Sequence, residues 1–363
     1  MRIKKILIIA TRQIGDTLIT TPMISAAKKI WPEAKIDFFG YVNSLTMLSG
    51  NSEVHRLIGT KPRPKLKDYL KQFFQLFQRY DLAIITQPSD RAYIYGILAA
   101  RNRVGIIPNE SKLNWWKKKV NLHSIEVDYF SQHVITEKIR LLEIFTSQEN
   151  LFDIPIHVTA PAIKEVPLEI QQELQEPYIV IHPNPLTAYK RWPTQKWKEL
   201  IEKLSPNYQI ILSSGPAPQD KKLNEEIISL LTSISQKKVI NLNGSLGLDQ
   251  LGAILRGANL YIGVDTSVTH LAAACNTPTI TLFGATPPTN FGPWPNGFIG
   301  KQPYQLKQQI QCIKNVTIIQ GPGECVPCRK AGCEDRADSK SDCLINLPTE
   351  WVLSAAKHYG INF

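Results

Sequence analysis

Hydroxyl side chains gather directly after a short apolar run in the second half of this 363-residue chain. Residues 260–264 have the apolar, partly β-branched composition of a buried strand, and Thr266, Ser267 and Thr269 follow at once. Residues 271–274 then continue with good helix formers. A turn between a strand and a helix N-terminus offers free backbone N–H groups and the positive end of the helix macrodipole to an anion. The stretch therefore predicts a binding site for an anion, above all a phosphate.

The simpler interpretation of this stretch is an ordinary capped helix, because Thr266 or Ser267 could accept a hydrogen bond from the first turn. A second apolar run supports the binding hypothesis, since residues 279–283 resemble a strand that ends at Gly284, before a proline-rich loop. Polar loops after two adjacent strands make the kind of crevice in which α/β proteins bind ligands. We therefore expect both loops to belong to one ligand site.

The N-terminal half carries an acid at the corresponding point of its first strand and helix. Residues 5–10 are expected to form a strand, because the continuous apolar run that follows Lys5 has the pattern of a central parallel strand. Asp16 stands where that strand gives way to a helix expected at 16–30. Asp16 could serve as the helix N-cap, or its carboxylate could face a cleft and accept a proton from an attacking hydroxyl. The sequence is compatible with both roles.

Two adjacent cations, Lys190 and Arg191, lie in the loop after another strand-like run, residues 178–182. The commonest environment of a lysine is the solvated surface. A lysine in this loop could instead offset the charge that builds on a departing diphosphate. Thr187 could add a hydroxyl donor here, because two prolines of the loop lack a backbone N–H.

The run Gly-Val-Asp-Thr-Ser-x-x-His-Leu-Ala-Ala-Ala starts at Gly263, and Thr-Pro-Thr-Ile-Thr-Leu-Phe-Gly follows it. Together they resemble the donor-site signature of glycosyltransferase family 9, which contains the ADP-heptose:lipopolysaccharide heptosyltransferases. Weaker matches are Ile-Gly-Asp at 14–16 and Lys-Arg-Trp-Pro at 190–193. The resemblance covers nearly the whole chain, and it implies an α/β protein of GT-B fold, with two doubly wound Rossmann-like domains facing a cleft.

The resemblance also implies an inverting, metal-independent glycosyltransferase without a cofactor. Asp16 would be the general base, and Lys190 would stabilise the leaving diphosphate. Because Asp265 is acidic, we expect it to contact sugar hydroxyls or local backbone donors, whereas His270 would contact a phosphate or pack within its helix. The donor-binding residues implied by the resemblance are Gly15, Thr187, Arg191, Gly215, Asp265, Thr266, Ser267, His270 and Gly284.

The expected donor is ADP-heptose or a similar nucleotide-sugar, and the expected acceptor is a lipid-linked glycan such as the lipopolysaccharide core. Ser267 stands where relatives often have a glycine, and prolines follow the strand at 178–182 where relatives often have a glycine and a small hydroxyl residue. These departures leave the exact sugar open. A protein acceptor for the same fold also stays open.

Two domains are expected from the restart of the strand pattern in mid-chain. Residues 153–166 are irregular and rich in proline, the composition of an interdomain linker. We expect an acceptor-binding domain at 1–165 and a donor-binding domain at 166–347. A final helix at 348–363 would pack back on the first domain.

Four of the six cysteines lie close together near the C-terminus: Cys325, Cys328, Cys333 and Cys343. Four thiolates at such spacings could bind zinc or iron, although the spacing is not that of a standard zinc finger. The alternative is a set of reduced structural thiols, which is the usual state in a cytoplasmic protein. We expect reduced thiols without a metal.

The formal charge of +11 indicates an anionic partner, which could be a nucleic acid, a nucleotide-sugar or an anionic membrane. The cations are dispersed and no nucleic-acid-binding module is recognisable, so nucleic acid is not the expected partner. An NAD-dependent oxidoreductase is also disfavoured, because no Gly-x-Gly-x-x-Gly turn follows the first strand of either half.

No apolar run approaches the ~18 residues of a membrane-spanning helix, and the N-terminal run is too short for a signal peptide. We therefore expect a cytoplasmic protein, peripheral on the inner face of the inner membrane. The expected contact is Trp115-Trp116 with Lys117, Lys118 and Lys119, helped by a basic run at 61–71, since aromatic rings and lysines suit an anionic interface. The alternative is one buried tryptophan beside a solvated lysine patch.

Overall fold

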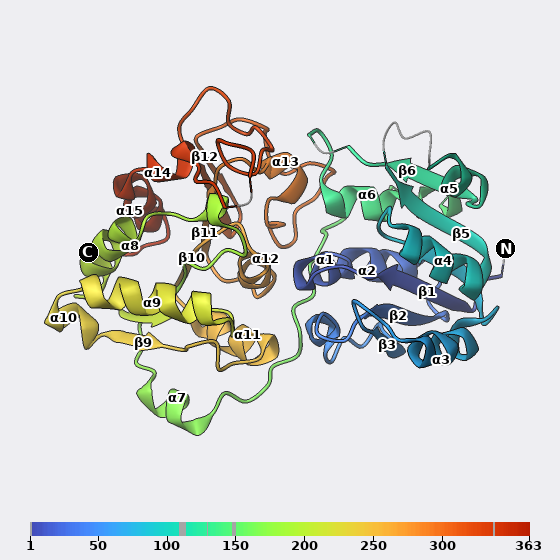
Figure 1. The fold of residues 1–363 in the computed structure, drawn as a ribbon, viewed down its shortest axis with the longest axis horizontal. Coiled ribbons are helices and arrows are strands. Elements are labelled where there is room, and N and C mark those ends of the chain that lie inside the picture. The colour runs from blue at the N-terminus through green and yellow to red at the C-terminus, as the bar shows by residue number, and fades with distance from the viewer. Residues whose placement is uncertain (1, 109–113, 129, 147–149, 337) are drawn as a thin grey trace. The chain divides into compact units, whose positions relative to one another are not determined.

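The computed structural model describes residues 2–108, 114–128, 130–146, 150–336 and 338–363. The chain divides into two compact units by its internal contacts (Figure 1). Unit 1 runs to Ala162 and includes Ile299–Gln302, and unit 2 comprises Ile163–Phe298 and Pro303–Phe363. The division lies in the proline-rich segment, three residues before the boundary expected at 165.

The described part of unit 1 contains a six-stranded parallel sheet of order β3-β2-β1-β4-β5-β6. Successive side chains of a strand point to opposite faces, and Ile6, Leu7, Ile8 and Ile9 of β1 are all fully buried. Helices therefore cover both faces of this sheet, as in a doubly wound fold. Its strands are β1 (Lys5–Ala10), β2 (Lys35–Tyr41), β3 (Arg56–Thr60), β4 (Tyr80–Ile85), β5 (Ala100–Ile107) and β6 (His123–Glu126).

The helices of unit 1 begin with a pair where one helix was expected at 16–30. Pro22 lies in the first turn of α2, where its missing N–H costs nothing and its fixed φ suits a helix start. The chain therefore ends α1 and begins α2 a few residues later. The helices are α1 (Ile14–Leu18), α2 (Thr21–Ile30), α3 (Leu66–Leu76), α4 (Asp90–Ala99), α5 (Trp115–Lys119) and α6 (Val134–Arg140), with 3-10 turns η1 (Leu45–Leu48) and η3 (Glu143–Phe145).

The described part of unit 2 contains a seven-stranded sheet of order β12-β13-β11-β10-β7-β8-β9. Its neighbouring strands pair in parallel, apart from the antiparallel pair β12–β13 at one edge. Its strands are β7 (Tyr178–His182), β8 (Gln209–Leu212), β9 (Val239–Asn241), β10 (Leu260–Val264), β11 (Thr279–Phe283), β12 (Ile310–Ile313) and β13 (Val316–Gln320). Because β7 lies between β10 and β8, the strand order changes direction beside it, which is where such sheets bind ligands.

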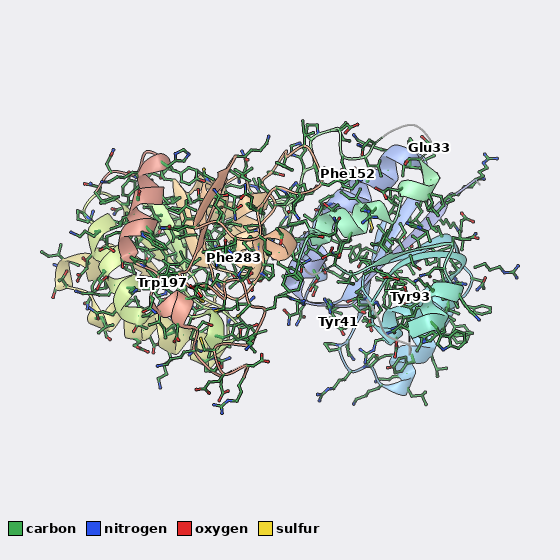
Figure 2. The ribbon with its side chains drawn as sticks, turned by 90° about the horizontal axis from the view of Figure 1, so that it is seen from above. Glu33, Tyr41, Tyr93, Phe152, Trp197 and Phe283 are labelled. Atoms are coloured by element: carbon green, nitrogen blue, oxygen red, sulfur yellow. The ribbon has the colours of Figure 1, made fainter. Side chains whose placement is uncertain are left out.

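Aromatic side chains fill the interior of each unit. Figure 2 shows Trp197 and Phe283 among the side chains of unit 2 and Tyr93 among those of unit 1, and all three are buried. The ring of Trp192 meets that of Trp197 edge-on, with 4.8 Å between their centroids. The helices of unit 2 are α7 (Leu168–Glu173), α8 (Thr194–Leu204), α9 (Pro218–Leu230), α10 (Ser233–Gln236), α11 (Leu248–Gly257), α12 (Ser267–Ala274), α13 (Pro288–Phe291), α14 (Asp342–Ile345) and α15 (Thr349–His358), with a 3-10 turn η4 (Ala188–Lys190).

The final helix, which was expected to pack on the first domain, has a docking site within unit 2. Helix α15 packs on α8 and on strands β11 and β13, all within unit 2 (Figure 1). Val352, Ala355 and Ala356 lie in the apolar core of that unit. Burial of this apolar face explains where the helix docks.

Within the described ranges, no helix combines the length and the apolar composition needed to cross a bilayer.

Candidate functional site

The loops after β7 and β10 bring an ion pair to the point where the strand order of unit 2 changes. Lys190 ends the 3-10 turn η4 in the loop after β7, and Asp265 follows directly on β10. These strands are hydrogen-bonded neighbours, so both loops leave the sheet at the same edge. The Nζ atom of Lys190 lies 2.5 Å from Oδ2 of Asp265, and both side chains are largely shielded from solvent.

Each member of this pair keeps its partner charged. Burial opposes the charge on Lys190, but the carboxylate of Asp265 outweighs burial, so the pKa of Lys190 is raised. Burial likewise opposes the charge on Asp265, but Lys190, then His270 and the hydroxyl of Thr286, hold its pKa below the usual value. An incoming diphosphate would therefore meet a fixed ammonium group that already has one anionic partner.

The N-terminus of α12 lies beside this pair and offers backbone donors. The helix begins at Ser267, after Thr266 in the N-cap position, and within the described ranges no side chain caps its first turn. Thr266 and Ser267 are half-buried. Thr269 points inward instead, because its hydroxyl donates to the carbonyl of Val264 at 2.6 Å. The first turn of α12, with Thr266 and Ser267, can thus receive an anion, whereas Thr269 is already engaged.

The remaining donor-side residues have more ordinary explanations in the structure. His270 is buried one turn into α12. It lies close enough to Asp265 to lower the pKa of the Asp265 carboxyl by its positive charge. A Cβ at Gly284 would lie 2.9 Å from Sγ of Cys343, so close packing already requires a glycine there. A Cβ at Gly215 would collide with the carboxylate of Asp220. Packing therefore accounts for Gly284, whereas the contact at Gly215 is with the end of a half-buried side chain that can turn aside.

Thr187 and Arg191 flank the short turn that carries Lys190. Thr187 occupies the N-cap position of η4 and Arg191 its C-cap position, and Arg191 is exposed. Between β7 and this turn, Asn184 is buried and donates to Oδ1 of Asn224 on α9 at 2.7 Å. This bond anchors the start of the loop and so helps to place Lys190.

In unit 1, Asp16 lies in the first turn of α1, whose N-cap residue is Gln13. The interpretation of Asp16 as the N-cap is therefore wrong. Its side chain keeps 21% of its surface exposed, and Nη1 of Arg12 lies 3.9 Å from Oδ1. A carboxylate in this position can accept a proton from a bound hydroxyl. Gly15 precedes it and is half-buried.

A buried lysine beneath α1 escaped the sequence analysis. Nζ of Lys138, on α6, donates to the carbonyl oxygen of Asp16 at 3.0 Å and to the hydroxyl of Thr20 at 2.7 Å. Burial lowers the pKa of Lys138 to about 8, although the charge of Asp16 opposes this shift. Lys138 lies 122 residues from Asp16 along the chain, so no local pattern could have paired them.

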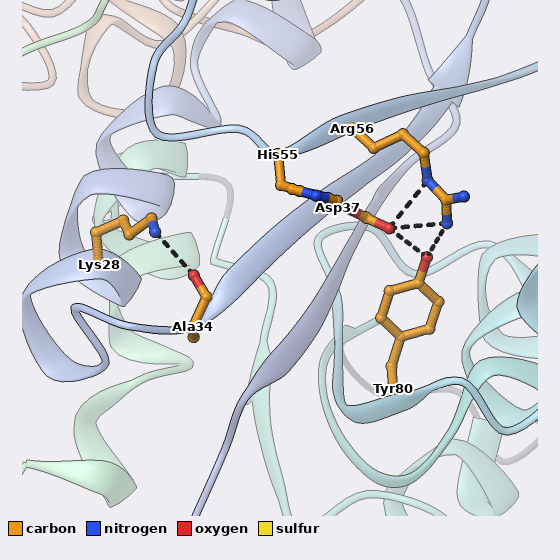
Figure 3. A network of polar contacts seen from close by, with 6 residues as sticks. All are labelled: Lys28, Ala34, Asp37, His55, Arg56 and Tyr80. Atoms are coloured by element: carbon orange, nitrogen blue, oxygen red, sulfur yellow. Dashed lines mark hydrogen bonds and ion pairs between the residues drawn. The ribbon is translucent and has the colours of Figure 1, made fainter.

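A second polar network in unit 1, centred on the buried Asp37, lies near the amino ends of three strands (Figure 3). Asp37 on β2 accepts from Nη2 of Arg56 at 2.9 Å and from the hydroxyl of Tyr80 at 2.8 Å, and Nδ1 of His55 lies 2.9 Å from it. Burial, then Asp37, raise the pKa of Tyr80. These contacts join β2, β3 and β4, which makes the network structural.

The tryptophan and lysine segment expected at a membrane is partly turned inward. Lys117 is buried, and its Nζ lies 2.6 Å from Oδ1 of Asp90. The ring of Trp116 packs edge-on against Tyr93 in the core of unit 1, with centroids 5.6 Å apart. Trp115 remains exposed. The inward tryptophan of the alternative interpretation describes Trp116, but Lys117 is buried and not solvated, because the helix uses both side chains to dock on unit 1.

The cysteines near the C-terminus are free thiols in the structure, as are the two elsewhere in the chain. Cys343 is buried, and burial raises the pKa of its thiol to about 11. Sγ of Cys333 accepts a bond from the backbone N–H of Asp342 at 3.3 Å. Among the described residues, no group of histidine, cysteine and acidic side chains has an arrangement that could hold a metal ion.

The chain resembles several solved structures along almost all of its length. E. coli ADP-heptose lps heptosyltransferase II superposes with a TM-score of 0.73 at 20% identity, over 98% of both chains. E. coli heptosyltransferase WaaC with ADP superposes with a TM-score of 0.68 at 20% identity, over 98% of this chain and 99% of the other. These likenesses identify the fold as GT-B, with two Rossmann-like domains.

Sequence relatives and a family model give the same assignment. The chain is 30% identical over 294 residues to lipopolysaccharide heptosyltransferase 3 of Escherichia coli, which covers 78% of this chain and 85% of the relative. It is 27% identical over 308 residues to lipopolysaccharide heptosyltransferase 1 of Salmonella typhimurium, over 79% and 90% of the two chains. Residues 70–319 match the model of glycosyltransferase family 9 (heptosyltransferase). The chain therefore belongs to glycosyltransferase family 9 and is a glycosyltransferase.

Proposed function

We propose that this enzyme transfers heptose, or a closely similar sugar, from an ADP-activated donor to the core of lipopolysaccharide. The observation that carries the proposal is the pair Lys190–Asp265 beside the first turn of α12, where no described side chain provides a cap. This is an arrangement suited to a diphosphate. A lipopolysaccharide acceptor is favoured over a protein acceptor because the similar sequences belong to lipopolysaccharide heptosyltransferases.

The reaction would proceed as a single displacement with inversion. The carboxylate of Asp16 takes the proton of an acceptor hydroxyl, and that oxygen attacks the anomeric carbon from the face opposite the diphosphate. The bond between the anomeric carbon and the diphosphate oxygen breaks as the new glycosidic bond forms, and ADP leaves with the electron pair. Lys190, the hydroxyls of Thr266 and Ser267 and the first-turn amides of α12 stabilise the negative charge on ADP.

Asp265 has a supporting role in this scheme. Its carboxylate would repel a phosphate placed directly beside it, so we assign it to holding Lys190 and to accepting bonds from sugar hydroxyls. The pair keeps Lys190 charged before the donor arrives. The ammonium group is then already in place when charge develops on the leaving group, which is the condition for effective electrostatic stabilisation.

The proposed acceptor is attached to lipid, so we also propose that the enzyme works in the cytoplasm as a peripheral protein on the inner face of the inner membrane. Its net charge of +11 suits an anionic lipid surface. No metal or other cofactor enters the proposed reaction.

Thermal unfolding with a panel of nucleotides tests the donor, because a ligand that binds only the folded protein raises its midpoint. ADP and ADP-heptose should raise the midpoint, and UDP-sugars at the same concentration should not. Transfer is then measured as ADP release and product mass with heptose-deficient lipopolysaccharide as acceptor. Stabilisation by UDP-sugars alone, or release of ADP without a glycosylated product, would contradict the proposal.

A further inference from the structure

Helix α3 of unit 1 exposes its apolar side to solvent and buries a partly polar one. Its inward positions are Gln72 and Leu76, which are 4% and 0% exposed. The outward side chains include Leu66 and Phe74, which are 76% and 68% exposed. The full set of exposed apolar side chains on the helix and at its C-cap is Leu66, Tyr69, Leu70, Phe73, Phe74 and Phe77.

These side chains form one continuous stripe. Positions 66, 69, 70, 73, 74 and 77 follow the three- and four-residue spacing that keeps residues on one face of a helix. Within the stripe, the rings of Phe73 and Phe77 stack with centroids 4.9 Å apart, and Phe73 meets Phe74 edge-on at 5.6 Å. The stripe is therefore a coherent surface and not a scatter of single apolar residues.

The core of unit 1 does not account for this stripe. The inward face of α3 is held by Gln72, whose amide donates to Oγ1 of Thr60 at 2.8 Å and accepts from the hydroxyl of Tyr95 at 2.5 Å. An amphipathic surface helix of a soluble protein normally turns its apolar stripe toward the core. A contiguous exposed apolar surface instead marks an interaction site.

Positive charge lies before the N-terminal end of the stripe and along one of its borders. Residues 61–77 contain five cations and one acid. The cations are exposed: Lys61, Arg63, Lys65, Lys67 and Lys71. The acid, Asp68, is partly neutralised by Lys61, whose Nζ lies 3.5 Å from its Oδ2. Lys67 and Lys71 are four residues apart, so they follow one border of the apolar stripe along the helix.

We propose that α3, together with residues 61–65, docks this enzyme reversibly on an anionic lipid bilayer. Leucine and aromatic side chains on one face, beside a basic border, are typical of helices that lie at the boundary between headgroups and acyl chains. The stripe enters that boundary, and the cations meet anionic headgroups. The reason for an enzyme to approach a bilayer comes from the lipid-linked acceptor of the proposed function. The assignment of the docking surface to α3 depends only on the exposed apolar side chains and the charge beside them.

Other occupants fit this surface less well. A second copy of the chain would bring an equally basic helix against it, and like charges repel. Nucleic acid would neutralise the cations but leave the phenylalanines and leucines without an apolar partner. An acidic amphipathic protein segment would satisfy both features, and the experiment below separates it from lipid.

Vesicle sedimentation of the full chain tests the proposal. Vesicles of phosphatidylcholine alone and with one quarter phosphatidylglycerol are compared at low and high salt. Wild-type protein should bind the anionic vesicles, bind neutral ones at least tenfold more weakly, and lose affinity with salt. The double variant Leu70→Gln/Phe74→Gln should bind on the order of 100-fold more weakly, since two half-inserted apolar side chains are lost. Lys67→Gln/Lys71→Gln should also weaken binding and reduce its salt dependence.

Two matched controls locate the surface. Ile234→Gln/Lys237→Gln changes an exposed isoleucine and a lysine of unit 2 and should leave binding unchanged. Trp115→Gln/Lys119→Gln changes the exposed part of α5 and should have less than a threefold effect. Loss of binding in the α5 variant with retention in the α3 variants would overturn the proposal. Unfolding midpoints within about 3 °C of wild type confirm that each variant is folded.

The outcome is separable from that of the proposed function. Transfer to a delipidated, water-soluble core oligosaccharide should be the same in wild type and in the α3 variants. Wild-type protein that ignores anionic vesicles but transfers heptose overturns the docking surface alone. Protein that binds vesicles through α3 but transfers no heptose counts against the proposed function alone. Self-association that Leu70→Gln/Phe74→Gln abolishes, without vesicle binding, would assign the stripe to a second copy and overturn the proposal.

Discussion

The two units place opposite chemistry at the same kind of structural position. In unit 1 the turn after β1 leads into α1 with the carboxylate of Asp16 in the first helical turn. In unit 2 the turn after β10 leads into α12 with Thr266 and Ser267, and no described side chain caps that helix. A carboxylate at a helix N-terminus itself occupies the positive end of the helix dipole. Uncharged hydroxyls leave that positive end available to a phosphate. One local architecture thus provides a candidate base in one unit and a candidate anion site in the other.

The two lysines beside these turns, Lys190 and Lys138, differ in their partners and in the direction of their pKa shifts. Lys190 is paired with a carboxylate, so although burial opposes its charge, its pKa is raised. Lys138 is buried against a carbonyl oxygen and a hydroxyl, and burial lowers its pKa to about 8. The comparison shows that the partner, and not burial alone, decides whether a shielded lysine keeps its proton.

The largest expected effect comes from removing the carboxylate of unit 1. Asp16→Asn preserves the shape of the side chain but cannot accept a proton, so the transfer rate should fall by about 10³-fold. The affinity for the ADP-sugar should stay within about twofold, because the proposed diphosphate contacts, Lys190 and the first turn of α12, belong to unit 2. Single-turnover kinetics and donor titration measure both quantities. Turnover near that of wild type would remove Asp16 as the base and with it the contrast between the two turns.

The pH dependence of stability sharpens the comparison of the two lysines. Between about pH 8 and the ordinary value of 10.5, the unfolded chain retains a proton on Lys138 that the folded chain has released. Stability rises with pH wherever the unfolded state binds more protons. The free energy of unfolding of wild type relative to Lys138→Met should therefore increase across this window, by up to about 3 kcal/mol. Denaturant titrations at several pH values measure it, and a flat difference would mean that Lys138 keeps its charge.

Removing the cation of unit 2 tests the anion site. Lys190→Ala should reduce kcat/KM for the donor by about 10²-fold, the loss expected for one transition-state contact. Lys237→Ala is the control, because this exposed lysine precedes β9 and lies at the opposite edge of the sheet. Asp265→Asn and the double variant Lys190→Ala/Asp265→Asn complete a double-mutant cycle. The two effects on kcat/KM should not be additive, because the side chains are in direct contact. Values of kcat and KM within twofold of wild type would show that Lys190 does not act on the donor.

The smallest effect distinguishes packing from binding at the edge of the donor site. Gly284→Ala places a methyl group 2.9 Å from Sγ of Cys343, which should lower the free energy of unfolding by about 1 kcal/mol. Because packing explains this glycine, KM for the donor should stay within twofold. A large rise in KM with unchanged stability would show instead that the backbone at Gly284 approaches the nucleotide.

Local pattern determined the central strands of both units. The runs at 5–10, 178–182 and 260–264 were expected as strands, and β1, β7 and β10 have these bounds. Such strands are buried on both faces, so their interior positions are apolar, and polar residues stand only at an end, as Lys5 and His182 do. The motif that begins at Gly263 likewise identified the family, because a turn that binds a phosphate needs its residues in one continuous stretch.

Only the tertiary structure decided which side chains meet and which faces are covered. Lys190 and Asp265 are 75 residues apart, and Lys138 and Asp16 are 122 residues apart. Periodicity identified neither pair, because it describes a segment and not its neighbours. Composition also misplaced one surface of unit 1, since Lys117, which was expected at a membrane, is buried. An amphipathic pattern defines two faces of a helix, but the packing of the whole unit selects which one meets solvent.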